Sequence, residues 1–318
     1  MAVALLSSPL NVHILQALET EALSPIDLRR AVNSPPQSTM RVYIRKLTDL
    51  NVLERRRYDG FPPTVDYALT PTGKALRKVG DALQAWLDVA PEGPVVLGTP
   101  GSKSAARALV DGWSTNIIRA LAARPYSLTE LSRLDVHTSY PALERRLSAM
   151  RLVNQVEPAP GDGRGTPYRA TEWLRKSVHP LIAATAWERK YLPEATKRIG
   201  RLDVEAAFLL AVPLMELPPD LSGRVRLAVE VQGGSSPAHA GALLEIAKGK
   251  VESCSVRLGG NADASVSGTA MGWLRQMNGH VSRRFVEFSG DQALGEAITT
   301  SLRATGLEAP LALEGPSG

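Results

Sequence analysis

The stretch Phe61-Pro-Pro-Thr-Val-Asp-Tyr-Ala-Leu-Thr-Pro-Thr-Gly-Lys-Ala-Leu76 decides how the first third of the chain folds. Residues 65–69 are rich in β-branched and aromatic side chains and follow two prolines, which is the pattern of a stiff strand. Thr70 and Pro71 form a typical helix start, because a threonine hydroxyl can cap the first turn and proline fits its first position. Residues 52–57 supply a matching strand just upstream. The stretch therefore predicts a β-hairpin that leads directly into a helix.

Three short helices are expected before this hairpin. The first two cover residues 11–18 and 24–30. In the third, apolar residues recur at i, i+4 and i+7, so one face is buried. Those residues are Met40, Ile44 and Leu47. The order helix, helix, helix, hairpin, helix is typical of a winged helix-turn-helix.

The same order of elements recurs further along the chain. Residues 114–121 resemble residues 11–18, and a short helix over residues 127–133 follows. A second hairpin is predicted over residues 152–156 and 168–170. The apolar spacing of the third helix also recurs, at Leu143, Leu147 and Met150. Self-similarity at an offset of about 100 residues indicates an internal duplication, so we expect two winged helix-turn-helix domains in tandem.

After about residue 200 the pattern changes to mixed helix and strand. Apolar residues alternate strictly over residues 225–231, which indicates a half-buried strand. Two more strands flank a turn at Lys248-Gly-Lys250, and helices are expected over residues 270–277 and 292–302. The predicted fold class is α+β. The predicted domains cover residues 1–92, 102–200 and 201–318.

Residues 61–76 resemble the wing and following helix of HxlR-type winged helix-turn-helix transcriptional regulators. That family carries a Pro-Pro-x-Val-Glu-Tyr-x-Leu-Thr-x-x-Gly-x-x-Leu run, from which this chain departs at Asp66. Trp86 resembles the family's tryptophan at the end of the helix. The second unit resembles a diverged copy, because it keeps residues 168–171 but lacks the Pro-Pro and the Gly. Over roughly residues 10–195 the resemblance implies sequence-specific binding of double-stranded DNA, usually as a repressor or an effector-responsive regulator.

In such a domain the third helix lies in the major groove, where its exposed side chains contact bases and phosphates. Arginine suits bidentate contact to guanine, and Ser or Thr near the helix start suits phosphate. Three successive arginines also rise into the wing, so at least one of them must face solvent or DNA. The predicted DNA-binding residues of the first domain are Ser38, Thr39, Arg41, Val42, Arg45, Arg55, Arg56 and Arg57.

The second domain offers a less uniform set. Glu144 lies within its third helix and would be repelled by phosphates unless it is paired. The glycine-rich loop over residues 161–165 lacks the Lys-Ser/Thr of a nucleotide-binding loop, so a wing tip on DNA is the simpler interpretation. Exposed arginines are also common as solvated surface residues, which is the alternative for both domains. The predicted DNA-binding residues here are Ser139, Tyr140, Arg145, Arg146 and Arg164.

Residues 263–277 and 285–291 resemble the sterol-carrier-protein fold. The resemblance implies a helix, a strand ending in Gly-Asp and a closing helix around a tunnel for apolar ligands. Large apolar side chains, which suit an adaptable pocket wall, concentrate here. The alternative is the ordinary core of a small domain. The candidate ligand-binding residues are Trp273, Leu274, Met277, Phe285 and Phe288.

Charge is unevenly distributed along the chain. The 37 basic and 32 acidic residues give a net charge of +5. Residues 1–200 contain 27 basic and 19 acidic residues, a net charge of +8, and residues 201–318 contain 10 basic and 13 acidic residues, a net charge of −3. This asymmetry favours an anionic partner for the first part. Within it, residues 101–200 carry net +7 and residues 1–90 only +2. We therefore expect the first domain to supply more of the specificity and the second more of the phosphate affinity.

Other classes of protein find little support. Cys254 is the single cysteine, which excludes an internal disulfide and a cysteine-based zinc site. The five histidines are at least 41 residues apart, so no local metal pair exists. No apolar run approaches the roughly 20 residues needed to span a bilayer. We expect a cytoplasmic protein with no enzymatic activity, no cofactor, no metal and no membrane contact.

The preferred function is a transcriptional repressor whose affinity for its operator is modulated by an apolar small molecule in the C-terminal domain. One alternative is a winged-helix module that binds other proteins. Another is a carrier of lipids or small molecules in which the winged helices are structural. Two DNA-binding units in one chain could mimic a dimer, or the chain could form a homodimer with four units.

Overall fold

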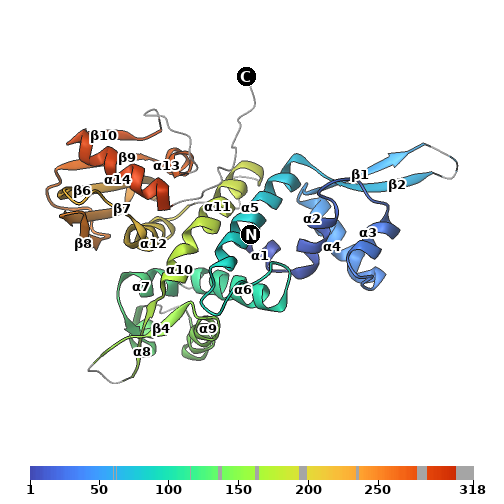
Figure 1. Ribbon diagram of the computed structural model, residues 1–318, viewed down its shortest axis with the longest axis horizontal. Helices are drawn as coiled ribbons and strands as arrows, with labels where there is room; N and C mark the ends of the chain where they lie inside the picture. The colour runs from blue at the N-terminus through green and yellow to red at the C-terminus, as the bar shows by residue number, and fades with distance from the viewer. Residues whose placement is uncertain are drawn as a thin grey trace. The chain divides into compact units, whose positions relative to one another are not determined.

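A computed structural model describes residues 1–59, 61, 63–114, 116–134, 138–161, 165–192, 199–233, 236–277 and 285–305. The chain forms two compact units (Figure 1). The first unit contains Met1–Arg107 together with Ala183–Thr196, and the second contains Ala108–Ile182 together with Lys197–Gly318. The two units are described separately below.

The first unit is a bundle of short helices with a projecting hairpin. Its elements are α1 (Ala2–Leu6), α2 (Pro9–Ala17), α3 (Pro25–Ala31), α4 (Gln37–Asp49), β1 (Leu53–Tyr58), β2 (Thr64–Leu69) and α5 (Pro71–Asp88). β1 and β2 pair antiparallel from Leu53 opposite Leu69 to Tyr58 opposite Thr64. Figure 1 shows this hairpin extending beyond the helices of its unit. A winged helix at the N-terminus is therefore present, as the sequence predicts.

Local sequence explains how the hairpin is anchored. The Thr70 hydroxyl caps α5 by accepting a hydrogen bond from the Gly73 amide at 3.1 Å. The same hydroxyl donates to the Asn51 carbonyl at 2.5 Å, which ties the start of α5 to the end of α4. Leu47 of α4 and Leu76 of α5 are fully buried in the core. Threonine thus fixes the geometry of the wing from its base.

The second unit begins with a similar series of elements. They are α6 (Pro100–Ser114, which crosses from the first unit), α7 (Ile117–Ala123), β3 (Tyr126–Ser127), α8 (Leu128–Leu134), α9 (Tyr140–Leu152), β4 (Val156–Pro158), β5 (Pro167–Ala170), α10 (Glu172–Lys176) and α11 (Val178–Tyr191). The strand predicted to start at Leu152 is wrong. Leu152 ends α9, and β4 starts at Val156, because a turn through Asn154 separates helix from strand.

The helical part of each unit makes similar hydrogen bonds at corresponding positions. Asn51 after α4 and Asn154 after α9 both adopt a left-handed backbone, with φ of 53° and 56°. The Thr171 hydroxyl repeats the role of Thr70: it accepts from the Leu174 amide at 3.1 Å and donates to the Asn154 carbonyl at 2.9 Å. An extended residue before the second helix pairs with the returning wing strand in both cases, Leu23 with Tyr67 and Tyr126 with Tyr168.

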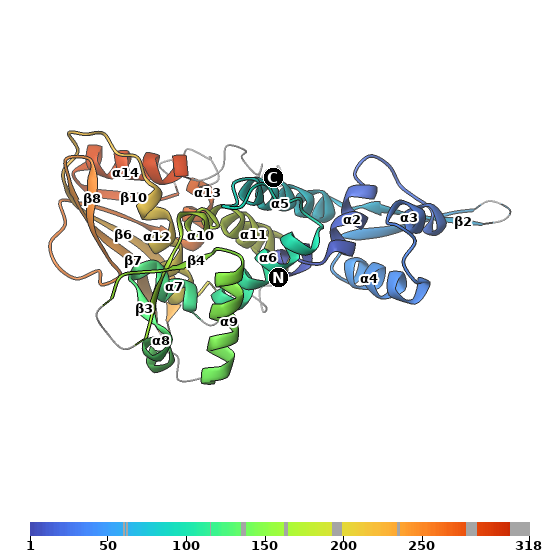
Figure 2. The same cartoon turned by 60° about the horizontal axis from the view of Figure 1, so that its bottom comes forward.

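The rest of the second unit is an α+β segment (Figure 2). Its elements are α12 (Arg201–Ala211), the 3₁₀ turn η2 (Val212–Leu214), β6 (Gly223–Gly233), β7 (Ser236–Ala247), β8 (Lys250–Ser255), β9 (Ala264–Thr269), α13 (Ala270–Met277), β10 (Glu287–Gly290) and α14 (Gln292–Thr305). The sheet order is β10-β9-β6-β7-β8, in which β6 and β9 are parallel and the other neighbours antiparallel. α14 packs against β9, β10 and β6.

α12 joins the α+β segment to the helical part of the second unit, since it contacts both α7 and β7. Glu205 on α12 is 1 % exposed. Its carboxylate accepts hydrogen bonds from Arg119 Nε at 2.6 Å and from Arg201 Nε at 2.7 Å. Trp113 Nε1 donates to the Asp203 carboxylate at 3.0 Å. A buried, paired carboxylate therefore lies at the junction of the two parts.

Within the described part of the chain, no helix is both long enough and apolar enough to cross a membrane. In the same residues, no group of three His, Cys, Asp or Glu side chains is placed to hold a metal ion.

Candidate nucleic-acid interface

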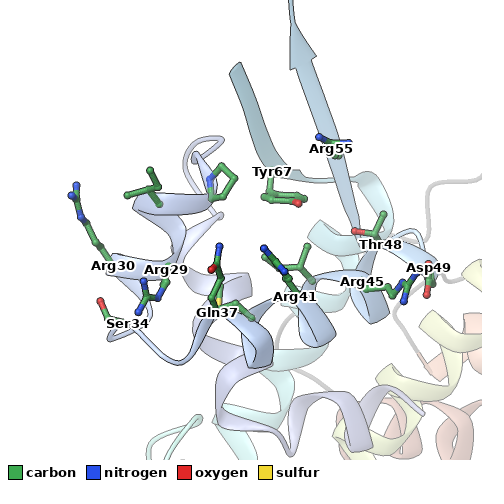
Figure 3. Close-up of a pocket in the computed structure, with 14 residues that line it drawn as sticks. Arg29, Arg30, Ser34, Gln37, Arg41, Arg45, Thr48, Asp49, Arg55 and Tyr67 are labelled. Carbon is green, nitrogen blue, oxygen red and sulfur yellow. The ribbon is translucent and has the colours of Figure 1, made fainter. Parts of the chain in front are cut away.

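The first unit contains a groove of about 670 Å³ between α3, α4 and the base of the wing. Figure 3 shows that side chains from all three elements surround it. Five arginines contribute to its lining. They are Arg29, Arg30, Arg41, Arg45 and Arg55. The groove is therefore strongly basic, which favours an anionic ligand.

α4 supplies the centre of this surface. Arg41 and Arg45 are exposed, lie one helical turn apart and make no hydrogen bond or ion pair with the described part of the chain. Val42 beside them is 64 % exposed. Ser38 is exposed and Thr39 is half-buried near the helix start. Two guanidinium groups and an apolar side chain are thus available to an outside partner.

The buried face of α4 differs in one place from the prediction. Met40 and Leu47 are buried in the core, as expected. Ile44 is half-buried and lines the groove instead. The groove floor is therefore partly apolar, beneath a rim of arginines.

The start of α4 is open. The N-cap residue Pro36 makes no side-chain cap, and the first turn contains no acidic residue. The amides of that turn therefore have no side-chain acceptor, and the positive end of the helix dipole is not neutralised. Such a terminus favours phosphate groups. α3 differs, because the Ser24 hydroxyl accepts from the Asp27 amide at 3.2 Å and closes its first turn.

The three wing arginines are divided between two faces of β1. Arg55 lines the groove, and Arg57 shares its face because side chains alternate along a strand. Arg56 points to the other face, where its guanidinium lies 2.6 Å from the Glu54 carboxylate. The hydrogen bond with Glu54 raises the pKa of Arg56. Arg55 and Arg57 therefore remain for a partner, and Arg56 is already paired.

Sequence reasoning missed the contribution of α3. Arg29 donates through Nε to the Pro35 carbonyl at 2.8 Å, which holds it beside the turn before α4. Arg30 lies 3.5 Å from the Asp27 carboxylate. Both line the groove, together with Gln37. The signal was the Arg-Arg pair at the end of the second predicted helix, which precedes α4 in the chain.

The corresponding surface of the second unit is less basic. On α9, Arg145 is exposed, Arg146 is half-buried and Glu144 is exposed beside them. Ser139 is the exposed N-cap, and Tyr140 is 47 % exposed. Arg164 falls outside the described residues. A further arginine that the prediction omitted, Arg151, donates to the Tyr168 hydroxyl at 3.0 Å.

Several of the basic residues behind the +7 charge of residues 101–200 make internal contacts. Arg119 pairs with Glu205, as described above. Arg175 donates to the Leu209 carbonyl at 2.8 Å and to the Ala122 carbonyl at 3.2 Å. Burial lowers the pKa of Arg175. These charges hold α12 against the helical part and are engaged in contacts within the second unit.

The predicted ligand-binding residues of the α+β segment pack against different helices. Trp273 is 5 % exposed, contacts Phe208 of α12 edge-on at 5.4 Å and donates through Nε1 to the Ala228 carbonyl at 2.9 Å. Phe288 lies close to Gly295 of α14. The remaining three are a buried Leu274 and the half-buried Met277 and Phe285. Gln276, on the same helix as Trp273, has a buried Oε1 that accepts no hydrogen bond from the described residues.

Comparison with known protein families finds a match in the first unit. Residues 5–92 match the family described as HxlR-like helix-turn-helix. The match includes α3, α4 and both wing strands, so the basic groove lies wholly inside it. It supports a DNA-binding transcriptional regulator.

Other similarities are limited. No curated protein matches the chain. One solved structure, described as a transcriptional regulator of the MarR family from Enterococcus faecalis V583, is 24 % identical over 27 % of this chain and 77 % of its own, with a TM-score of 0.26. At that TM-score the likeness carries no structural argument.

Proposed function

We propose that this protein is a sequence-specific regulator of transcription that binds double-stranded DNA through the groove of its first unit. The observation that carries the proposal is the arrangement of Arg41, Arg45 and Arg55 around one groove without partners in the described part of the chain. Unpaired guanidinium groups on a helix and an adjacent wing are what phosphate and base recognition requires.

In this proposal each of these residues has a distinct role. Arg41 and Arg45 face the major groove, where each bidentate contact to guanine contributes about 1–3 kcal/mol of discrimination. Val42 between them suits the methyl group of thymine. Ser38 at the open start of α4 binds phosphate, and Arg55 with Arg57 follows the backbone beside the wing.

The helical part of the second unit acts as a second, diverged winged helix-turn-helix. The matching positions of Asn51 and Asn154, and of Thr70 and Thr171, support this. Its own DNA surface consists of Ser139, Tyr140, Arg145 and Arg146, with Arg164 at the wing. Because Glu144 lies among them and repels phosphate, this surface contributes less affinity and less base discrimination than α4.

The α+β segment senses an apolar small molecule and lowers affinity for the operator, which makes the protein a repressor that the molecule releases. Support comes from the order α13, β10, Gly290-Asp291, α14, which is the order that the sterol-carrier resemblance implies. The buried Oε1 of Gln276, which has no partner among the described residues, offers an acceptor to a hydroxyl or N–H group on an otherwise apolar ligand. The size of the effect equals the difference in ligand affinity between the DNA-bound and released states.

The test of DNA binding begins with selection from a pool of random duplexes, followed by titrations at several salt concentrations. The wild-type protein is expected to enrich one sequence and to lose affinity steeply as salt rises. Arg41→Ala/Arg45→Ala should abolish the preference. Lys74→Ala/Lys78→Ala, which removes the same charge from an exposed part of α5, should keep it. A flat salt response, or a preference that survives the α4 variant, would overturn the proposal.

The sensor role is tested by thermal unfolding with a panel of apolar metabolites. A ligand is expected to raise the unfolding temperature of the second unit and to weaken DNA binding in parallel. If no member of the panel shifts the transition, the α+β segment has a structural role.

A second candidate function applies to the second unit alone. Three large apolar side chains on and beside α9 are exposed: Leu134 at 58 %, Tyr140 at 47 % and Leu152 at 81 %. Together with Glu144 they suit a protein partner. If Arg145→Ala/Arg146→Ala leaves the affinity for the selected DNA unchanged, this function is favoured over DNA contact.

A further inference from the structure

We propose that a single chain is the complete DNA-binding assembly. Its own α11 completes the first unit, so one chain presents two unlike DNA-binding surfaces to an operator with two unlike halves. The inference rests on the proposed DNA-binding function and deepens it.

The first observation is the position of the second half of α11. This helix starts in the second unit, yet its residues from Ala183 onward belong to the first. Trp187 is 2 % exposed and donates through Nε1 to the Thr72 carbonyl at the start of α5, at 2.9 Å. Glu188 accepts a hydrogen bond from the Ala2 amide at the start of α1, at 2.7 Å. Both terminal helices of the first unit are therefore bound by this segment.

The second observation is the nature of those contacts. A buried indole whose N–H reaches a backbone carbonyl is a specific contact, because both the ring volume and the hydrogen bond must be matched. Ala183, Ala184 and Ala186 beside it are also buried, so the helix approaches closely through small side chains. α11 therefore occupies the surface of α1 and α5 as a core element of the first unit.

This occupancy argues against one mode of dimerisation. A homodimer that paired its first units through α1 and α5 would need that surface on both copies. In this chain the surface is filled from within. The helix that fills this surface is α11, which follows the second hairpin. In the internal repeat α11 corresponds to α5, and Trp187 corresponds to Trp86. The first unit thus takes one of its core helices from a later part of the same chain.

The consequence for DNA follows from symmetry. Identical subunits bind palindromic sites, because the symmetry of the operator mirrors that of the protein. Here the two surfaces differ: among the described residues, β1 and β2 of the first wing pair at six positions, and β4 and β5 of the second wing pair at three. α4 presents Arg41 and Arg45, and α9 presents Arg145 beside Glu144. Unlike surfaces select unlike half-sites, one of them strongly specified by α4 and the other weakly specified.

The test combines light scattering with a set of operator variants. The free protein and its complex with the selected duplex should each contain one chain of 34.1 kDa. The selected sequence should have two unlike halves. Palindromes built from either half should bind about tenfold more weakly than the selected site, because mismatched base pairs cost about 1–3 kcal/mol each.

The outcomes separate this inference from the function on which it rests. If no sequence is enriched, the proposed function fails and the inference falls with it. If a palindrome is enriched and two chains bind it, DNA binding stands and only the single-chain assembly is overturned. A two-chain mass for the free protein would also overturn it.

Discussion

In the first unit α4 presents Arg41 and Arg45, which have no partner among the described residues, to a basic groove, whereas in the second unit α9 presents the exposed Arg145 beside Glu144. The scaffolds beneath are alike: an asparagine in a left-handed turn closes each helix, and a threonine caps the helix after each hairpin. The surfaces differ although the second segment is the more basic in sequence. The charge of a segment therefore says less about DNA binding than the direction in which its arginines point.

The same comparison explains where the excess charge goes. Arg119 and Arg175 bind groups on α12, so they connect the second helical part to the α+β segment. In the first unit Gln16, which occupies the place of Arg119 in the repeat, is exposed. Among the described residues, the corresponding position is thus free of such a contact in the first helical part, whereas the second helical part is joined to the α+β segment through α12.

The largest expected effect concerns the dependence of the first unit on α11. Trp187→Ala removes a buried indole and should destabilise the first unit by about 4 kcal/mol, a typical cost for truncating a large buried aromatic side chain. Hydrogen exchange resolved by residue measures it, with protection lost in α1 and α5 and retained in β6 and β7. Trp187→Phe keeps most of the ring and should cost about 1 kcal/mol for the hydrogen bond. Equal loss of protection in both units would show that they do not fold as separate bodies.

The next effect concerns the contact between Arg119 of α7 and the buried Glu205 of α12 in the second unit. Arg119→Ala leaves the buried Glu205 with a single partner and should destabilise the second unit by about 3 kcal/mol. Arg124→Ala is the matched control, because the Arg124–Glu130 pair is exposed and contributes less than about 1 kcal/mol. Chemical denaturation measures both. Equal effects of the two variants would mean that the Glu205 contact contributes no more than a surface pair.

The next prediction concerns the stability of the protein in acid. Burial lowers the pKa of His179 in α11 to about 4, from an ordinary value of 6.5. The unfolded chain then binds the proton more readily than the folded chain, so stability falls as the pH drops from 6.5 towards 4. The loss is about 2 kcal/mol, from about 1.4 kcal/mol per pKa unit reduced for partial exposure. His179→Gln should flatten this dependence in thermal unfolding between pH 7 and 4; an unchanged slope would assign the acid sensitivity to other groups.

The smallest effect tests the two faces of the wing. Arg55→Ala should weaken binding to the selected DNA by about 1 kcal/mol and reduce the salt dependence by about one counterion. Arg56→Ala removes the same charge from the face that Glu54 already occupies, and affinity should stay unchanged. Titration by fluorescence anisotropy gives both values. Equal losses for the two variants would show that general charge, and not the groove, attracts the DNA.

Sequence patterns predicted the parts of this molecule that depend on local chemistry. The cap at Thr70, the hairpin before it and the alternating strand over residues 225–231 follow from neighbouring residues, and the structure contains all three. The arginines at 41 and 45 could be assigned to one surface because helical spacing fixes their direction. Both residues lie within the stretch 5–92 that matches the HxlR-like family.

The features that escaped prediction are set by contacts between distant residues. Nothing near Trp187 in the sequence indicates that it packs on α5, more than 100 residues earlier. Glu205 appears as an ordinary charge on a helix until Arg119 and Arg201 are seen around it. Which face of β1 carries Arg56 depends on strand register. These contacts can be identified only in the folded structure, because tertiary packing determines which residues become partners.

The position of Trp187 also has a consequence for synthesis on the ribosome. α5 ends at Asp88, and the segment that completes the first unit begins at Ala183, so about 95 residues must be translated in between. At about 5–20 residues per second this is a delay of roughly 5–20 s. During that time α1 and α5 have emerged without the helix that covers them. The nascent chain therefore passes through a period in which an apolar surface is exposed, and chaperone binding should concentrate in that interval.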